Sequence, residues 1–444
     1  MKAARAESDK RLREGGNAKK VALVCDWLTN VGGAEKVLLK IHEMYPDAPI
    51  YTSQYNPKKI DWFLGADVRT GWLQKLPTRL RKFLGPLRQR YFEKLDLSEY
   101  DLVISVTGAE AKAVKTRNEK TGKKAIHISY CHVPTQYYWQ MYDDYVENPG
   151  FGALNPVVRF CFKKMVAPLR RRDYEAALKV DQFVTISEYA RGLIRKYYRR
   201  NAKIVHPPVD IDNFSISSVK SQEEQGNKSR KSQEDRELWL KNILEKSQGA
   251  EMAGGCGKLV ENFETRGGFY VTTSRQVTWK RLDLAVKACV ETERPLLVVG
   301  EGPEHNALMK MADNAPLVRF LPLTGKRELA MILSYARGYL FPSLEPFGIA
   351  PVEAMGVGCP VIAYGEGGAR DYVIPGVNGV MFGEQTVASL VRAIEGFETK
   401  KFDKEKIAES VAKFGEERFV RELEEVTKEC LKSDANEKDD SEAQ

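Results

Sequence analysis

The sequence predicts an α/β protein built from two parallel-sheet domains. Its 444 residues exceed what a single hydrophobic core usually supports, so we expect two domains. In both halves of the chain, short apolar runs typical of buried strands alternate with helix-like stretches, which is the pattern of a parallel sheet. A polar and charged stretch at 215–258 interrupts this alternation and indicates a junction between the halves.

The first half of the chain predicts one domain at 19–210. Residues 1–18 are polar, and we expect them to be disordered. The run at 19–28 predicts a buried strand, and a glycine pair after it leads into a helix-like stretch. Further strand-like runs follow at 101–106, 124–131, 182–187 and 203–210. Ser187 is placed to cap the helix that follows the third of these runs.

The second half predicts another domain at 263–414, which begins with a strand at 269–274. The segment 211–262 before it is rich in Ser, Lys, Glu and Gln and has little apolar periodicity, so we interpret it as a solvated linker or insertion. Residues 433–444 carry five acidic residues and one lysine and form an acidic tail.

The composition indicates which classes of partner the protein binds and in which cellular compartment it lies. The net charge of +8 and the pI near 8.9 favour an anionic partner, which can be nucleic acid, a phospholipid surface or a phosphorylated ligand. The seven cysteines include no CxxC pair, which disfavours a metal cluster or a disulfide framework. No apolar run is long enough to span a bilayer, and the first twenty residues lack the apolar segment of a signal peptide. We therefore expect a cytoplasmic protein.

The strongest chemical signal is a pair of glutamates, Glu345 and Glu353, with seven residues between them. Glu345 precedes a turn at Phe347 and Gly348, and Glu353 follows in an apolar, helix-like stretch. A turn followed by a helix can direct both carboxylates at one polyhydroxyl ligand, because each oxygen accepts hydrogen bonds from hydroxyls. Two glutamates at this spacing without a surrounding motif would more often be one residue that caps a helix and one helix residue that faces solvent.

In the context PSLEPFGIAPVEAMGVGCPVIAYGEGG, these residues resemble the signature of the retaining glycosyltransferases of family four. The resemblance covers about 19–430 apart from the segment near 215–260. It implies the GT-B fold, in which two Rossmann-like parallel-sheet domains face each other across a cleft. It also implies that Glu345 lies near the donor sugar, that Glu353 binds the nucleotide ribose, and that a helix at 415–432 packs back on the first domain. The apolar Phe419, Leu423 and Val426 recur at helical spacing there.

Two cations support the resemblance. Arg275 and Lys280 follow the strand at 269–274, where fixed positive charge can stabilise a leaving nucleoside diphosphate. Arginine can also bind two phosphate oxygens at once. Taken alone, the two residues are better explained as an exposed basic helix entry, but the resemblance implies that they clamp the diphosphate.

Further candidates come from three loops. Gly32 and Gly33 lie between a strand and a helix, where free amides can approach a phosphate, although a plain tight turn has the same sequence. His132 directly follows a strand, and the resemblance implies contact with the sugar. The resemblance likewise places Gly300 in the nucleotide pocket, and Phe347 and Gly348 at the substrate. The backbone at 321–324 is assigned to the base by the same analogy.

The resemblance also implies the reaction. The pattern is most similar to O-antigen and exopolysaccharide mannosyltransferases, so we expect GDP-mannose as the donor substrate and no cofactor. No DxD motif stands where a metal would bridge the diphosphate, so we expect metal-independent transfer with retention. The alternatives are a UDP-sugar transferase of the same fold and an inactive nucleotide-sugar-binding scaffold. A nucleic-acid-binding protein is suggested only by net charge, and we expect no nucleic-acid partner.

The segment 73–90 carries six basic and no acidic residues, with apolar residues at helical spacing between them. This pattern suits an anionic membrane surface, and it equally suits an amphipathic helix packed on its own domain. We expect it to hold the protein at the inner face of the cell membrane beside a glycan or polyprenyl-diphosphate-linked acceptor.

Overall fold

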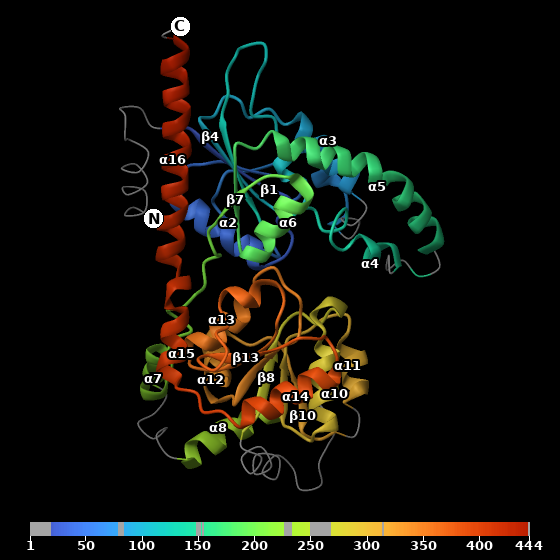
Figure 1. Cartoon of the computed structure of the whole chain (residues 1–444), viewed down its shortest axis with the longest axis vertical. Helices are drawn as coiled ribbons and strands as arrows, with labels where there is room; N and C mark the ends of the chain where they lie inside the picture. Colours follow the sequence, from blue (N-terminus) through green and yellow to red (C-terminus); the bar gives the residue numbers. More distant parts are fainter. Residues whose placement is uncertain are drawn as a thin grey trace. The chain divides into compact units, whose positions relative to one another are not determined.

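A computed structural model describes residues 19–78, 84–147, 152, 155–225, 233–248, 268–312 and 315–442, with the side chains of 223–225, 233–237 and 434–442 left out. The described chain divides into two compact units (Figure 1). Unit 1 holds the residues up to Pro208 and those from Glu417 onward, and unit 2 is Val209–Glu416. The expected disordered segment 1–18 lies outside the described residues. None of the helices in the described ranges has the length and apolar character needed to cross a membrane.

Unit 1 contains a seven-stranded parallel sheet in the order β3-β2-β1-β4-β5-β6-β7. The strands are β1 (Val21–Cys25), β2 (Ile50–Thr52), β3 (Val68–Thr70), β4 (Leu102–Thr107), β5 (Ile126–Cys131), β6 (Gln182–Thr185) and β7 (Ala202–Ile204). The helices are α2 (Gly33–Met44), α3 (Gly85–Lys94), α4 (Tyr142–Glu147), α5 (Asn155–Leu178), α6 (Glu188–Tyr198) and α16 (Glu416–Glu442). Every residue of β1, β4 and β5 is buried, as expected for central strands of a parallel sheet covered on both faces.

Unit 2 contains a six-stranded parallel sheet in the order β10-β9-β8-β11-β12-β13. The strands are β8 (Tyr270–Thr273), β9 (Leu296–Val299), β10 (Val318–Leu321), β11 (Gly338–Phe341), β12 (Val361–Tyr364) and β13 (Gly379–Phe382). The helices are α7 (Ile216–Gln225), α8 (Gln233–Glu245), α10 (Leu282–Glu291), α11 (His305–Met311), α12 (Lys326–Tyr335), α13 (Ile349–Gly356), α14 (Val387–Glu398) and α15 (Lys404–Val411). The prediction of an α/β protein with two parallel sheets is therefore confirmed.

Both sheets reverse their strand order at one place, between β1 and β4 in unit 1 and between β8 and β11 in unit 2. The loops after two such strands leave in opposite directions, so the carboxyl ends of the strands there are the usual ligand-binding position of open α/β sheets. The residues that follow these four strands are therefore the first place to look for a functional site.

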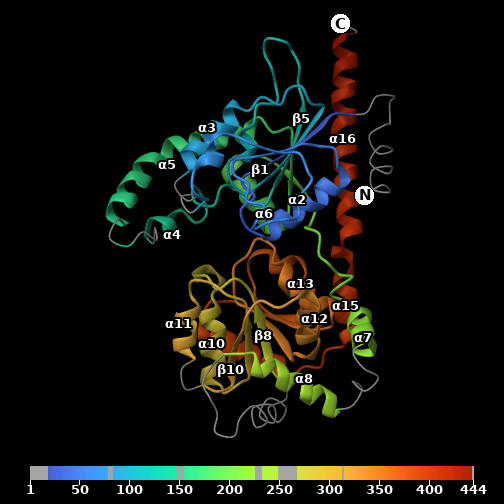
Figure 2. The same cartoon turned by 180° about the vertical axis from the view of Figure 1, so that it is seen from behind.

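Helix α16 belongs to unit 1, although it follows unit 2 in the sequence. Phe419 and Leu423 are fully buried, and the Phe419 ring packs edge-on against Tyr130 of β5. Arg418 donates to the carbonyl of His206 over 3.0 Å, and Lys203 pairs with Glu429. Figure 2 shows α16 from behind. The helix covers the range 415–432 that the resemblance implied and continues through the acidic segment to Glu442.

The segment interpreted as a solvated linker, 211–262, differs from that expectation where it is described. Leu240, Ile243 and Leu244 of α8 are buried, and the ring of Trp239 lies against Tyr335 of α12. Gln248 also exchanges two backbone hydrogen bonds of 2.7 Å with Phe320 of β10. These residues therefore form part of unit 2, while 226–232 and 249–267 lie outside the described residues.

Candidate functional site

Two loops of unit 2 meet at its sheet reversal. The loop after β8 carries Lys280, in the short 3₁₀ helix Thr278–Lys280, and the loop after β11 carries Glu345. Lys280 Nζ lies 2.5 Å from Glu345 Oε1, and the two side chains are 21% and 19% exposed. Ser343 donates a second hydrogen bond of 2.9 Å to the same carboxylate oxygen. The structure thus brings together one predicted cation and one predicted carboxylate at a surface that solvent still reaches.

The backbone beneath Glu345 is held by a glycine turn after β12. The amide of Gly368 donates to the carbonyl of Glu345 over 2.8 Å. A Cβ atom on Gly368 would lie 2.3 Å from Phe347 Cα, and one on Gly367 would lie 2.5 Å from the Glu345 carbonyl oxygen. Only glycine allows this approach. The sequence motif contains both glycines, but we did not predict a role for them because a contact with Glu345 has no signal in sequence spacing.

Helix α13 starts at Ile349, four residues after Glu345. Gly348 precedes its first residue with φ +91, and a Cβ atom there would lie 2.6 Å from the Phe341 ring. Tyr372 donates a 2.9 Å hydrogen bond to the carbonyl of Phe347. Glu353 lies on this helix and is 7% exposed. The helix start is therefore fixed by tight backbone contacts, which limit how far the Glu345 loop can move.

Tyr339 of β11 joins two neighbouring strands at the sheet reversal of unit 2. Its hydroxyl lies 3.0 Å from Thr273 Oγ1 at the end of β8. Burial is the main cause that raises the pKa of Tyr339, and the carboxylates of Glu345 and Glu353 raise it further. The hydrogen bonds from Thr273 oppose these effects.

The loops after β8 and β9 are clamped together by Gln276, which is fully buried. Its Nε2 donates to the carbonyl of Gly300 over 2.5 Å, and its Oε1 lies 2.8 Å from a ring nitrogen of His305. Gly300 has φ +123, and a Cβ atom there would lie 2.2 Å from the Ser274 carbonyl oxygen. Arg275 lies between Ser274 and Gln276 and is exposed. Its backbone is thus held in place on both sides, while its side chain faces solvent.

In unit 1, Asp26 occupies the corresponding position at the end of β1. Its carboxylate accepts hydrogen bonds from the amides of Gly108 and Ala111, at 3.0 and 2.7 Å, and from the hydroxyl of Thr107. Burial raises the pKa of Asp26, the nearby Glu110 carboxylate adds to this, and the two amide hydrogen bonds oppose it. Asp26 joins the loops after β1 and β4 at the reversal of the sheet. The sequence analysis did not assign it a role.

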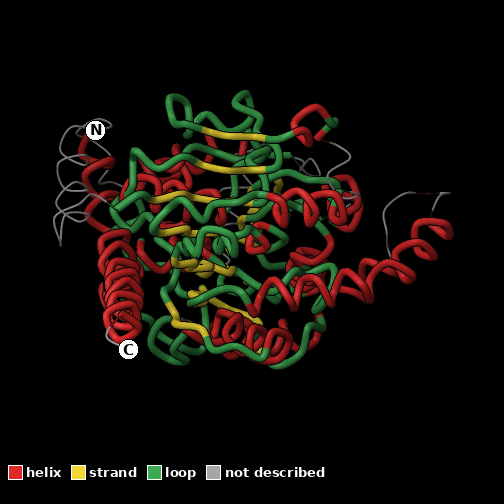
Figure 3. The backbone as a smooth tube through the Cα atoms, turned by 90° about the horizontal axis from the view of Figure 1, so that it is seen from above, coloured by secondary structure: helices red, strands yellow, loops and turns green. Residues whose placement is uncertain are grey.

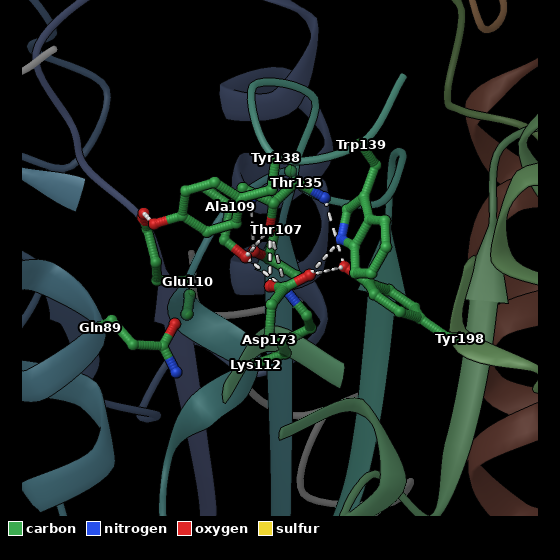
Figure 4. A network of polar contacts seen from close by, with 12 residues as sticks. Gln89, Thr107, Ala109, Glu110, Lys112, Thr135, Tyr138, Trp139, Asp173 and Tyr198 are labelled. Carbon is green, nitrogen blue, oxygen red and sulfur yellow. Dashed lines mark hydrogen bonds and ion pairs between the residues drawn. The ribbon is translucent and has the colours of Figure 1, made fainter. Parts of the chain in front are cut away.

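Unit 1 contains two buried ion pairs, and Figure 4 shows the one between Lys112 and Asp173. Lys112 Nζ lies 2.5 Å from Asp173 Oδ1, and both side chains are at most 1% exposed. Asp173 also accepts hydrogen bonds from the Thr135 hydroxyl, the Trp139 indole and the Tyr198 hydroxyl, at 2.8, 2.7 and 2.8 Å. The carboxylate thus has four donors, which compensate for its removal from water.

The second pair joins Arg88 of α3 to Glu110, at 2.9 Å between Arg88 Nε and Glu110 Oε2. Tyr137 donates to Glu110, and the Arg88 guanidinium lies 4.8 Å from the ring centre of Trp27. Together, the two pairs hold the aromatic segment that follows His132. Neither pair was predicted, because charged residues in a sequence are normally expected to face solvent.

His132 and the glycine pair lie at the same edge of unit 1. The His132 amide donates to the Thr107 carbonyl over 2.9 Å, and its ring lies edge-on to Tyr130. Among the described residues, His132 Nε2 has no hydrogen-bond partner, although it is buried. Burial lowers the pKa of His132 to about 4, so the ring is neutral at neutral pH. Gly32 precedes α2, and Gly33 is the first residue of that helix, which has no side-chain cap.

The segment 73–90 does not match the expected lipid-facing stripe where it is described. Leu73 and Leu84 are buried, and Arg88 forms the buried pair with Glu110. Lys75 and Arg90 are exposed. The prediction that 73–90 faces lipid is wrong for these three buried residues, because they pack within their own unit. Residues 79–83 lie outside the described residues.

Parts of the chain are similar in sequence to known proteins. Residues 260–418 match the family model described as glycosyl transferases group 1. The chain is 32% identical over 134 residues to an uncharacterized glycosyltransferase, YqgM, of Bacillus subtilis, a match that covers 28% of this chain and 37% of that one. It is 32% identical over 120 residues to the α-1,3/1,6-mannosyltransferase ALG2 of Homo sapiens, covering 27% and 28%. The chain thus matches these relatives over well under half of their length.

Solved structures extend the likeness to both units. The complex of Anabaena Alr3699/HepE with UDP matches with a TM-score of 0.59 at 19% identity, covering 93% of this chain and 100% of that one. Sucrose-phosphate synthase of Thermosynechococcus elongatus matches with a TM-score of 0.61 at 15% identity, covering 94% and 100%. The chain has the two-domain GT-B fold. Within it, residues 260–418 are similar to the group 1 glycosyl transferases.

Proposed function

We propose that this protein is a retaining glycosyltransferase that moves a hexose from a nucleotide sugar to a glycan or lipid-linked saccharide. The observation that carries the proposal is the contact of Lys280 with Glu345 at the sheet reversal of unit 2, inside the matched region. A cation beside a carboxylate that accepts hydroxyl hydrogen bonds suits a ligand with a phosphate at one end and a sugar at the other.

In this proposal, Lys280 and Arg275 bind the diphosphate and stabilise the charge that develops as it leaves. Their fixed positive charge supplies what a divalent metal supplies in other transferases, so transfer proceeds without a metal cofactor. Arg275 is exposed and free to turn toward phosphate oxygens, and Gln276 and Gly300 fix its backbone. Glu345, with Phe347 and Gly348, contacts the donor sugar, and Glu353 holds the ribose.

Unit 1 receives the acceptor. The α2 amides at Gly32 and Gly33 offer donors to a phosphate or sugar oxygen, since the first turn of a helix has unpaired amides. His132 contributes a neutral imidazole whose buried Nε2 is available to a sugar hydroxyl. The leaving phosphate assists removal of the acceptor proton on the same face of the sugar, which accounts for retention of the anomeric configuration.

For the donor, we propose GDP-mannose, as implied by the resemblance to polysaccharide mannosyltransferases and supported by the partial match to a mannosyltransferase. We place the activity in the synthesis of cell-surface polysaccharide, at the inner face of the cell membrane. A UDP-sugar donor is the second candidate, because the Anabaena neighbour is described in complexes with UDP and UDP-glucose. An inactive nucleotide-sugar-binding scaffold is a further alternative that the assay separates.

A donor panel tests the proposal. The full chain is incubated with GDP-mannose, UDP-glucose, UDP-galactose or UDP-N-acetylglucosamine, and nucleoside diphosphate release is measured with and without a saccharide acceptor and with excess EDTA. We expect GDP-mannose to give the largest acceptor-dependent release, unchanged by EDTA, and a product that keeps the donor's anomeric configuration by NMR. Release from UDP-sugars alone would establish the second candidate. Tight donor binding without turnover would establish the scaffold, and recovery only with magnesium or manganese would refute metal independence.

A further inference from the structure

Helix α5 of unit 1 has apolar side chains on two different sides. On one side, Val166 and Leu169 are buried, and the Phe162 ring packs against Tyr142 of α4 at 5.7 Å between ring centres. On the other side, Val157 and Phe160 are 61% and 64% exposed. Because residues advance about 100° around a helix, Val157, Phe160 and Cys161 lie together on a stripe that faces away from the buried one. Cys161 is also exposed.

The N-terminal part of α5 extends away from the sheet of its own unit, as Figures 1 and 3 both show. Single exposed apolar residues are common on protein surfaces, but a stripe of large ones on an extended helix indicates a partner. Met165, one turn beyond Cys161, is 41% exposed and continues the same apolar surface. We call Val157, Phe160, Cys161 and Met165 the outer stripe.

The charge around the outer stripe indicates which partner covers it. Between 155 and 172 the sequence has six Lys and Arg residues and no Asp or Glu. Lys163 and Lys164 are exposed, and Lys164 Nζ lies 5.9 Å from the centre of the Phe160 ring. On the neighbouring helix α4, Asp143, Asp144 and Glu147 are exposed, and the Glu147 carbonyl accepts a hydrogen bond from Arg159 of α5. Two lysines beside an aromatic and aliphatic stripe form the surface that peptides and peripheral enzymes present to anionic lipid.

We propose that the outer stripe and its lysines dock this protein onto an anionic lipid bilayer. The apolar side chains enter the boundary between headgroups and acyl chains, and the ammonium groups of Lys163 and Lys164 reach lipid phosphates. A second copy of the chain is a poorer occupant, because pairing two such stripes would bring four lysines of like charge together. The surface is separate from segment 73–90, whose Leu73, Leu84 and Arg88 are occupied within unit 1.

This proposal rests on the proposed function in one respect, since a lipid-linked acceptor requires a protein at the membrane. The binding to lipid is measured without donor or acceptor. The full chain is co-sedimented with vesicles of phosphatidylcholine alone or mixed with phosphatidylglycerol. We expect binding to the mixed vesicles and little to the neutral ones, weakened when the salt concentration is raised about tenfold. The double variant Val157→Ser, Phe160→Ser should bind at least about tenfold more weakly because the apolar contact is lost.

The variant Lys163→Ser, Lys164→Ser should also lose about tenfold or more of the binding, and only on anionic vesicles. Leu64→Ser is the matched control, since Leu64 is 69% exposed elsewhere in unit 1. Leu87→Ser, Arg90→Ser tests the segment 73–90. Thermal melts and turnover with a water-soluble acceptor should stay unchanged in all four variants, which shows that they fold.

Three results would overturn the inference: wild-type binding that is absent from anionic vesicles, stripe variants that bind as wild type does, or loss of binding only in the Leu87 and Arg90 variant. A wild-type dimer in sedimentation that the stripe variants abolish would identify a second copy as the occupant instead. Absence of turnover in a chain that still binds vesicles through the stripe would reject the proposed function and leave this inference in place.

Discussion

Replacing Lys280 with Met removes the cation at Glu345 and keeps most of the aliphatic stem. The ion pair at 2.5 Å lies at a surface where the side chains are 21% and 19% exposed, so water replaces much of what the pair contributes to folding. A pair in such a setting stabilises a protein by about 1 kcal/mol or less. A fixed charge that acts on a leaving group is worth about 3 kcal/mol of barrier, which corresponds to a loss of about a hundredfold or more in kcat. We therefore expect Lys280→Met to leave folding nearly unchanged and to remove almost all turnover.

The assay compares kcat for donor cleavage with the melting temperature in the same preparation. Lys287→Met on α10 is the matched control, because Lys287 is an exposed lysine of the same unit. Lys280→Arg keeps the charge and should retain more turnover than Lys280→Met. If Lys280→Met turns over within a few-fold of the wild type while folding normally, the assignment of Lys280 to the diphosphate is refuted. If its melting temperature falls far below that of Lys287→Met, the ion pair contributes more to folding stability than its exposed position implies.

Three further outcomes follow from the geometry. Asp173→Ala leaves the Lys112 ammonium buried without its carboxylate, and chemical denaturation should show a loss of about 3–5 kcal/mol; a loss under about 1 kcal/mol would mean that water already reaches the pair. Gly368→Ala places a Cβ atom 2.3 Å from Phe347 Cα, so it should displace the Glu345 loop and strongly reduce turnover. Gly383→Ala is the control and should not reduce turnover, because a Cβ atom there meets nothing within 4 Å. His132 has a folded pKa of about 4, below the ordinary 6.5, so the unfolded chain binds the proton first and stability falls as the pH is lowered from 6.5 to 4. His132→Phe should flatten this dependence by about 1.4 kcal/mol per pH unit, and an unchanged slope in denaturation measured across that range would contradict the burial argument.

The sequence pattern alone singled out the candidate residues in unit 2, because a pattern on one chain segment reports that segment well. Glu345 and Lys280 were recognisable from their neighbours, and the structure adds that they touch. The roles of Gly367 and Gln276 were not predictable, since each depends on an approach between loops that are far apart in the chain. A glycine that admits a distant carbonyl looks in sequence like any other turn glycine.

The charged network of unit 1 was missed for a different reason. Arg88, Lys112 and Asp173 are read from sequence as solvent-facing, because isolated charges are almost never buried. Their burial depends on partners that the sequence does not pair, and Arg88 was counted instead in a basic surface. The strands β2 and β3 were missed because three residues carry too little pattern to register.

The interruption of unit 1 by unit 2 sets an order of events in synthesis. The face of the first unit that carries Tyr130 is completed by Phe419 and Leu423 of α16, which leave the ribosome only after all of unit 2. Until then, the apolar surface around Tyr130 in the nascent first unit stays uncovered. Unit 2 holds all its strands and helices in one continuous stretch and can fold first. Fragments cut after Pro208 should consequently aggregate unless a peptide of α16 is supplied in trans. A fragment that starts near Val209 and ends near Glu416 should fold on its own.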